Sequence, residues 1–443
     1  MTIVQTLAEF AADFEKRQVP GQIVHHAKRA VIDWYAALLP GAISAPAIFL
    51  ERALAGELDR GTSKLALGRR ATPRAAALIN GTAAHTAEVD DIFREAIYHP
   101  GAPIIAAVLA ATQEQGSNGA TFLKGVIAGY EISTRIGVAM GRAHYRFWHN
   151  TGTIGTFGAA AAAAVIYGLD PERFAHALAN AATFAAGLQQ AFRTGSMSKP
   201  LHAGRAAEGG LLAALAAREG VTGSLDVLEG DVGFGRAMGG DPDWNAALAN
   251  LGHEFHIAKV TFKNHACCGH AFAAIDGALE LQRKLGVAAR DIAWVTVETY
   301  GEALQVAGNP RPMTPGEARF SIPYVVATAL VHGSVRLAAF DAERIADPMT
   351  CDLMERIALK RDGDIDAGFP GRRAARVGIE TRDGRREQFL QPTRKGDPEL
   401  PLTDYELEEK YRELAIPVIG ESKAAILLEH LWRLDSLPHV DLH

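Results

Sequence analysis

Apolar residues in the first half of the chain recur mainly with the period of an α-helix. The pair Thr72-Pro73 predicts a helix start, because threonine caps helix N-termini and proline suits the first helical position. We expect that helix to run toward His85. The pair Asp170-Pro171 shows the same pattern of cap and proline before a predicted helix over 172–192. Another predicted helix covers 121–140.

The pattern changes from about residue 256. Residues 291–300 alternate between apolar and polar side chains, as a half-buried strand does, and 257–262 is a second candidate strand. The segments 375–381 and 385–390 flank Arg382-Asp383-Gly384, which predicts a hairpin because Asp-Gly tolerates the positive φ of a tight turn.

Helical periodicity returns near the end of the chain. Residues 403–406 form a capping-box pattern, and apolar positions at helical spacing follow over 407–414 and 422–434. The sequence therefore predicts a mostly α fold: a large all-helical domain from 1–255 and 400–443, plus a smaller α+β lid domain over 256–399.

Composition agrees with a globular protein of 443 residues, of which 48% are hydrophobic and 22% are charged. The net charge is -6 without a run of lysine or arginine, which argues against a nucleic-acid surface. The first residues carry acidic side chains at helical spacing, unlike a signal peptide. The apolar stretches 101–111 and 155–169 are shorter than the roughly 18–20 residues of a membrane span, so none is expected. Three cysteines make no disulfide framework, and we expect a reducing, cytoplasmic location.

The first candidate site segment gathers acids, arginine, tyrosine and histidine between His85 and Pro103. Its residues of interest are Glu88, Asp90, Asp91, Arg94 and His99. His99 precedes Pro-Gly and an apolar helical run, so a helix starting there would direct free N–H groups at an anion such as a carboxylate. From residue types alone, a capped helix end beside a solvated acidic patch is an equally good interpretation.

Two further segments place one chemically useful side chain among small residues. Tyr145 and His149 precede a Gly/Thr-rich run, which would allow a ligand to approach the backbone closely. Ser196 and Lys199 lie beside proline and further small residues, where a partly buried lysine would serve as a fixed cation or as a base. A satisfied histidine at a helix start and an exposed loop lysine are the competing interpretations.

The fourth segment begins at Lys263 and contains His265, Cys267, Cys268 and His270. Two histidines and two cysteines within six residues suggest a metal site. On this alternative the chain would be a metal-holding or ligand-binding protein without catalytic activity. Zinc sites usually draw paired ligands from two separated segments, and no second CxxC or HxxxH pattern occurs. Structural thiols are therefore the favoured interpretation, and no metal is expected.

Taken in order, these segments resemble the MmgE/PrpD family, whose members include 2-methylcitrate dehydratase, cis-aconitate decarboxylase and iminodisuccinate epimerase. The resemblance extends along the whole chain. Its motifs are Asn80-Gly-Thr-Ala-Ala-His85 with Asp90-Asp91 and His99-Pro-Gly; His149 before Gly-Thr-Ile-Gly-Thr; Ser196-Met-Ser-Lys199-Pro-Leu-His; Leu228-Glu-Gly-Asp; Phe262-Lys263 with Cys267; and Glu317-Ala-Arg319 with Tyr324.

The resemblance implies a large helical domain, a smaller α+β lid, an active site between them and a homodimer. It implies no metal, iron–sulfur cluster or organic cofactor. The family's catalytic histidine matches His99, its acidic partner falls at Glu88, Asp90 or Asp91, and its second histidine matches His149. Its two site lysines match Lys199 and Lys263, and its lid tyrosine matches Tyr324. The sequence departs from the family pattern at Ile92 and at the segment from His265 to His270.

The implied function is a cofactor-independent lyase acting on a small di- or tricarboxylate by proton abstraction next to a carboxylate. Such a C–H bond is weakly acidic, so cations must hold the developing charge, and Lys199, Lys263 and Arg94 are the candidates. His99 would move the proton, since an imidazole titrates near neutral pH. In an epimerisation, two groups on opposite faces would exchange one proton, and Tyr145 or His149 would supply the second. We rank dehydration first, epimerisation of an iminodisuccinate-like dicarboxylate second and decarboxylation of a cis-aconitate-like tricarboxylate third.

Overall fold

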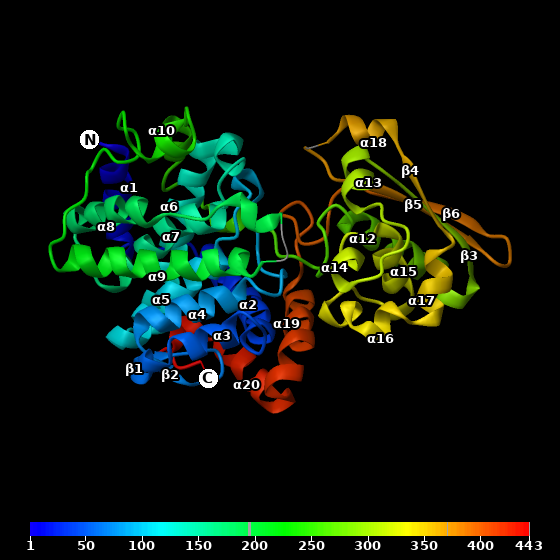
Figure 1. Cartoon of the computed structure of the whole chain (residues 1–443), viewed down its shortest axis with the longest axis horizontal. Helices are drawn as coiled ribbons and strands as arrows, with labels where there is room; N and C mark the ends of the chain where they lie inside the picture. Colours follow the sequence, from blue (N-terminus) through cyan, green and yellow to red (C-terminus); the bar gives the residue numbers. More distant parts are fainter. Residues whose placement is uncertain (194–195, 370, 443) are drawn as a thin grey trace. The chain divides into compact units, whose positions relative to one another are not determined.

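The computed structural model describes residues 1–193, 196–369 and 371–442, which form two units (Figure 1). The first unit comprises Met1–Phe262 and Thr403–His443, and the second comprises Lys263–Leu402. The first unit is mainly helical and the second combines helices with one main sheet, which confirms the predicted mostly α fold class.

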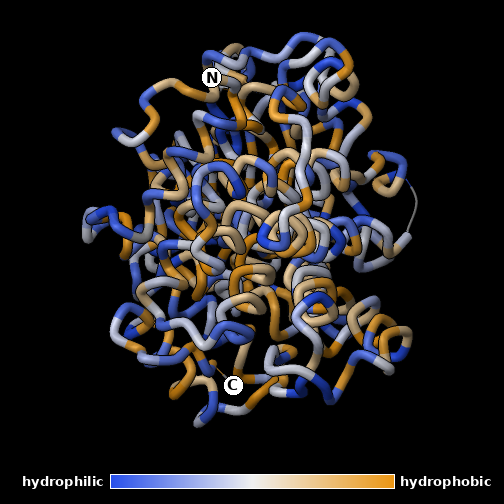
Figure 2. Tube along the Cα trace, turned by 90° about the vertical axis from the view of Figure 1, so that its left-hand side faces the viewer, coloured by the Kyte–Doolittle hydropathy of each residue, from blue (hydrophilic) through white to orange (hydrophobic). Residues whose placement is uncertain are grey.

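The helical unit is organised around α7 (Asn150–Ile166), in which every residue is buried. Its alanines and glycines have small side chains, so neighbouring helices approach closely. Figure 1 shows α7 beside α8 and α9, and Figure 2 shows orange and blue residues interspersed along the helices of this unit. Its other elements are α1 (Ile3–Ala12), α2 (Gly21–Ala42), α3 (Ala47–Ala53), β1 (Leu58–Lys64), β2 (Arg70–Ala71), α4 (Pro73–Ala84), α5 (Gly101–Gln115), α6 (Gly119–Tyr145), α8 (Pro171–Phe184), α9 (Ser198–Arg218), α10 (Phe234–Met238), α11 (Trp244–Leu248), α19 (Asp404–Ile419) and α20 (Glu421–Trp432).

The predicted helix starts are confirmed by their capping hydrogen bonds. Thr72 accepts from the backbone N–H of Ala75 at 3.3 Å, and Asp170 accepts from that of Arg173 at 2.9 Å. At α19 both halves of the capping box around Thr403 are present. These bonds satisfy N–H groups that have no partner within the helix, so the local sequence sets where each helix begins.

The helix predicted over 172–192 is shorter than expected. It ends at Phe184, because Ala185 is extended and Gly187 has a φ of 137°. The chain then pairs Leu188 with Trp148, and the carbonyl of Gly187 accepts from the backbone N–H of His149 at 2.9 Å. The residues that follow the early end of α8 therefore pair with the backbone at the start of α7.

The second unit contains a four-stranded sheet in the order β4-β3-β5-β6. The central strand β3 (Ile292–Thr299) is parallel to β4 (Ile357–Arg361) and antiparallel to β5 (Ala375–Thr381). Strands β5 and β6 (Arg386–Gln391) form the predicted hairpin, with Gly384 at a φ of 89°. The helices of this unit are α12 (Phe272–Leu285), α13 (Gly301–Ala307), α14 (Pro315–Ala318), α15 (Ile322–His332), α16 (Ala342–Ile345), α17 (Pro348–Met354) and α18 (Gly363–Ala367).

The strand predicted over 257–262 is wrong. The segment His256–Lys259 is a 3-10 helix, and the pairing of Thr261 with Ile92 is an isolated antiparallel bridge rather than part of a strand. That bridge ties the end of the segment to the loop that carries the acidic residues.

Among the described helices, none is by itself long and apolar enough to span a membrane. The pair α2 and α3, bent by 69°, meets the criteria of length and composition when taken together.

Candidate active site in the helical unit

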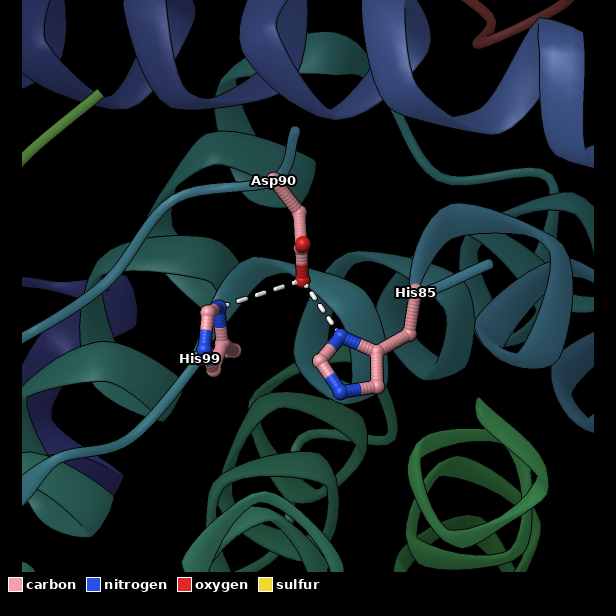
Figure 3. Close-up of side chains that lie close together, drawn as sticks. All are labelled: His85, Asp90 and His99. Atoms are coloured by element: carbon pink, nitrogen blue, oxygen red, sulfur yellow. Dashed lines mark hydrogen bonds and ion pairs between the residues drawn. The ribbon is translucent and has the colours of Figure 1, made fainter. Parts of the chain in front are cut away.

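Three side chains from the first candidate segment meet around one carboxylate oxygen (Figure 3). His85 is the C-terminal cap of α4, Asp90 lies in the following loop, and His99 lies two residues before α5. Oδ2 of Asp90 is 2.6 Å from Nδ1 of His85 and 3.4 Å from Nδ1 of His99. The side chains of His85 and Asp90 are 0% and 1% exposed and that of His99 is 12% exposed, so water competes weakly for these contacts.

The backbone of this loop is held in an unusual conformation. Glu88 and Ile97 have φ values of 59° and 48°, in the left-handed region that residues with a Cβ rarely adopt. Phe93 and Tyr98 form a bridge within the loop, and Ile92 forms the bridge with Thr261. Strained residues of this kind persist where the surroundings fix them, and they concentrate at functional sites.

Asp91 has a different role from its neighbour. Its Oδ1 accepts from the backbone N–H of Gly101 at 3.0 Å, and its Oδ2 accepts from the hydroxyl of Tyr130 at 2.7 Å. Burial, reinforced by the nearby carboxyl groups of Asp33 and Asp90, raises the pKa of Asp91 to about 8. The N-terminus of α5, which the sequence offered to a substrate carboxylate, is therefore occupied by Asp91.

A second pair of histidines adjoins the first. His149 is the N-cap residue of α7. Its ring stacks on that of His85 with centroids 5.4 Å apart. Its Nδ1 is 3.2 Å from Nδ1 of His202 on α9. Burial lowers the pKa of His149 well below its ordinary value, and electrostatic repulsion between protonated His149 and the neighbouring basic side chains, Lys199 among them, adds to this. Burial and His85 likewise lower the pKa of His202. Both rings are therefore uncharged near neutral pH, and one Nδ1 donates to the other.

Lys199 supplies a cation at the start of α9, three residues before His202. It forms an ion pair with Glu88, and its side chain is 18% exposed against 41% for Glu88. Its Nζ lies 5.2 Å from the centre of the Phe192 ring, which also packs edge-on against His149 at 4.8 Å. The structure thus brings together five residues that the sequence singled out: Glu88, Asp90, His99, His149 and Lys199.

The four histidines His85, His99, His149 and His202 form a histidine cluster. His85 and His202 were not among the predicted site residues. The sequence did contain a signal for each. His85 lies five residues before Asp90, and His202 lies one helical turn after Lys199, where side chains share a face.

Three other predicted residues of this unit are placed elsewhere along its elements. Arg94 begins the 3-10 helix Arg94–Ala96, and Tyr145 is the last residue of α6. Ser196 is exposed, with its Oγ 3.4 Å from the carbonyl oxygen of Ala191. Thr194 and Gly195, which belong to the Lys199 segment, lie outside the described residues.

The remaining predicted residues lie in the second unit, which begins with Lys263. Nε2 of His265 is 2.8 Å from Oδ1 of Asp276. The hydroxyl of Tyr324 is buried and donates to the carbonyl of Ala339.

The histidines and cysteines of the fourth segment do not gather into a ligand set among the described residues. Nδ1 of His270 pairs with the hydroxyl of Tyr300 at 2.8 Å, while His265 pairs with Asp276. Burial raises the pKa of the Cys267 and Cys268 thiols, which disfavours the thiolate that binds metals. These contacts support the interpretation of both cysteines as structural thiols.

The donor atoms of His85, Asp90 and His99 lie within 4.8 Å of one another, a spacing that a metal ion could bridge. Two histidines and one carboxylate are also a known ligand set for transition metals. However, ligands that each lie about 2.0–2.1 Å from an ion are separated by about 3 Å or more. The 2.6 Å between Nδ1 of His85 and Oδ2 of Asp90 is shorter than this and is a normal charge-assisted hydrogen bond.

Characterised proteins similar to this chain share one activity in their names. A cis-aconitate decarboxylase-like protein of Aspergillus oryzae is 28% identical over 95% of this chain and 92% of its own length. The cis-aconitate decarboxylase of Aspergillus terreus is 26% identical over 99% of this chain and 94% of its own length. The human cis-aconitate decarboxylase is 27% identical over 83% of this chain and 78% of its own length.

Two family models cover most of the sequence. The MmgE/PrpD N-terminal domain matches residues 5–247, which include the histidine cluster, and the MmgE/PrpD C-terminal domain matches residues 265–435. The chain therefore belongs to the MmgE/PrpD family and is an enzyme of that type.

Proposed function

We propose that this enzyme is a lyase that decarboxylates a small tricarboxylate of the cis-aconitate type, with His99 as its proton-transfer group. The observation that carries the proposal is the contact between Nδ1 of His99 and the carboxylate of Asp90, beside the buried rings of His85 and His149. The names of the three relatives favour decarboxylation over the dehydration that the sequence ranked first.

The chemistry requires one carbon–carbon bond to break and one carbon–hydrogen bond to form. As CO2 leaves, the electron pair of the broken bond moves into the substrate and delocalises toward a remaining carboxylate. A proton from the imidazolium of His99 then completes the product. Asp90 favours this role, because a carboxylate at Nδ1 stabilises the imidazolium and leaves Nε2 for the substrate.

Lys199 and the neutral imidazoles provide the binding groups for a substrate with three carboxylates. In the free enzyme Lys199 is paired with Glu88, so a substrate carboxylate would compete with Glu88 for the ammonium group. His149 and His202 are uncharged near neutral pH, and the ring that accepts at Nδ1 carries its own hydrogen on Nε2, where it can donate to a substrate carboxylate.

Dehydration of a hydroxytricarboxylate is the second candidate, and one observation favours it. Removing water requires a base for the C–H proton and an acid for the leaving hydroxyl. The cluster offers two proton-transfer groups for these tasks, His99 beside Asp90 and the pair His149–His202.

The test is to incubate the purified protein in heavy water with cis-aconitate, 2-methylcitrate and iminodisuccinate separately, and to follow each by NMR. Decarboxylation predicts that cis-aconitate loses CO2 and that its product gains one deuterium at carbon. Water loss from 2-methylcitrate alone would favour the dehydratase, and inversion of iminodisuccinate alone would favour the epimerase. No change in any of the three would overturn the proposal.

We also propose that activity needs no metal and that the enzyme is a homodimer, as the family resemblance implies. Exhaustive chelation with EDTA should leave turnover unchanged, because the His85–Asp90 contact has the length of a hydrogen bond. Loss of activity that one metal restores would contradict this. Light scattering at micromolar concentration should give twice the 47.2 kDa chain mass, and a monomer would contradict the dimer.

A further inference from the structure

His85 makes the shorter of the two contacts to the carboxylate of Asp90. The distances to Oδ2 are 2.6 Å from His85 and 3.4 Å from His99. The His85 side chain is 0% exposed, and His85 is the C-terminal cap residue of α4. The helix therefore fixes the position of the backbone from which the ring extends. His85 is therefore placed to hold Asp90 rather than to meet a substrate.

The other ring nitrogen of His85 indicates where its hydrogen lies. Among the described residues, Nε2 of His85 is buried and has no hydrogen-bond partner. A hydrogen on Nε2 would leave a buried donor unsatisfied, and it would also place the Nδ1 lone pair against a carboxylate oxygen. A hydrogen on Nδ1 avoids both penalties, so His85 donates to Asp90 through Nδ1–H.

The ring of His85 is further held by its neighbours. It stacks on His149 with an interplanar angle of 24°, and it lies 4.9 Å from the ring of His99 at a tilt of 59°. A ring packed against two neighbouring rings keeps Asp90 in one orientation. That orientation places the same oxygen 3.4 Å from Nδ1 of His99, an ion-pair distance at which these two atoms do not form a hydrogen bond in this structure (Figure 3).

We propose that His85 is a positioning residue: its Nδ1–H holds Asp90 beside His99, so that neutral His99 carries its hydrogen on Nδ1, toward Asp90, and Nε2 is the nitrogen that takes up and gives the transferred proton. The catalytic meaning of this arrangement rests on the proposed function. The arrangement of hydrogens itself does not, and it can be measured without substrate.

The experiment uses protein with 15N-labelled histidine, in which nitrogen chemical shifts report which ring nitrogen carries the hydrogen. The two resonances are assigned with His85→Asn and His99→Gln. In the wild-type protein, at a pH where the rings are neutral, His85 and His99 should each carry their hydrogen on Nδ1. A hydrogen on Nε2 of either residue would overturn the proposal.

A matched pair of variants then separates positioning from packing. His85→Asn places an amide N–H near the position of Nδ1, whereas His85→Gln places it near Nε2, and both amides are uncharged and smaller than the ring. We expect His85→Asn to keep the Nδ1–H form of His99 and to lose less than about tenfold in kcat. His85→Gln should show both forms of His99 and lose about 10²-fold in kcat with little change in KM, the lower end of the range for a general acid–base group.

The outcomes separate this inference from the proposed function. Equal losses in both variants that follow their melting temperatures would mean that His85 only supports the fold, and an unchanged form of His99 in His85→Gln would also overturn the inference. If no substrate in the panel reacts while the two wild-type rings carry hydrogen on Nδ1, the proposed function fails and the hydrogen arrangement stands.

Discussion

Burial shifts the ionisation of neighbouring side chains in opposite directions within the helical unit. It lowers the pKa of the imidazole of His149, whose charged form is the protonated one. It raises the pKa of Asp91 to about 8, because the charged form of a carboxyl group is the deprotonated one. The same low-dielectric environment thus keeps both groups uncharged near neutral pH.

Because of Asp91, the free energy of unfolding should fall as the pH rises. Its pKa of about 8 in the folded protein lies above the ordinary value of 3.8, so its stabilising contribution is complete below 3.8 and is lost as pH approaches 8. We predict that Asp91→Asn, which imitates the protonated acid, reduces the fall in melting temperature between pH 6.5 and 8. Asp59→Asn, at a fully exposed site, is the control. Identical slopes in Asp91→Asn and the wild-type protein would contradict the prediction.

His99 and Lys199 should fail in different ways when replaced. His99→Gln keeps size and some hydrogen bonding but removes the titrating group, so kcat should fall by about 10²–10⁴-fold. Lys199→Met keeps the stem but removes a charge-assisted bond worth roughly 1.5–3 kcal/mol, so KM should rise as well. Steady-state kinetics and thermal melts on the same preparations check both. Near-wild-type turnover, or a loss that only follows unfolding, would remove that residue from the site.

At the scale of elements, α9 depends on glycine for its approach to α4. A Cβ on Gly204 would overlap the hydroxyl of Thr82 and the carbonyl oxygen of Leu78, both on α4. Gly204 lies two residues after His202, so this contact sets where the start of α9 meets the end of α4. The helix contact therefore brings the second histidine pair to the first.

Gly204→Ala should consequently damage both stability and activity, because backbone and side-chain atoms of α4 would have to move. Gly209→Ala on the same helix is the matched control, since its Cβ would lie 3.4 Å from Cβ of Phe184, an ordinary contact. We expect the control to be neutral or to stabilise by up to about 1 kcal/mol through helix propensity. Melting curves and kcat for the pair provide the test, and equal behaviour of the two variants would refute this account of α9.

At the scale of the whole molecule, several buried histidines in both units resist protonation. Burial lowers the pKa of His144, His256 and His270 to about 4 each, and that of His149 well below its ordinary value. Each contributes stability that is present above the ordinary value of 6.5 and is lost as the pH falls toward the folded value. Asp91 and Glu131, whose pKa values are raised by burial, oppose this trend.

The four histidines outnumber these two carboxyl groups, so acidification should destabilise the fold. We predict that the melting temperature falls from pH 7 to pH 5. Calorimetry at intervals of half a pH unit would measure it. His144→Gln should flatten the slope if its imidazole contributes, since glutamine does not titrate. A melting temperature that is constant or rises toward pH 5 would contradict the prediction.

The sequence determined the local starts of helices, the hairpin and the motifs of the family. Thr72, Asp170 and Thr403 cap their helices through side-chain bonds to residues three positions ahead, so no distant contact is needed. Asp383-Gly384 likewise fixes its turn through a local backbone preference.

Only the tertiary structure decided which side chains share the site. Asp90 and Asp91 are adjacent in sequence, yet one meets His85 and His99 while the other joins Gly101 to Tyr130. The left-handed conformations of Glu88 and Ile97 accompany this difference, and no local propensity favours them. The proximity of His202 to His149 depends in turn on α9 packing against its neighbours, because contacts between residues distant in sequence are chosen by the whole core rather than by either segment.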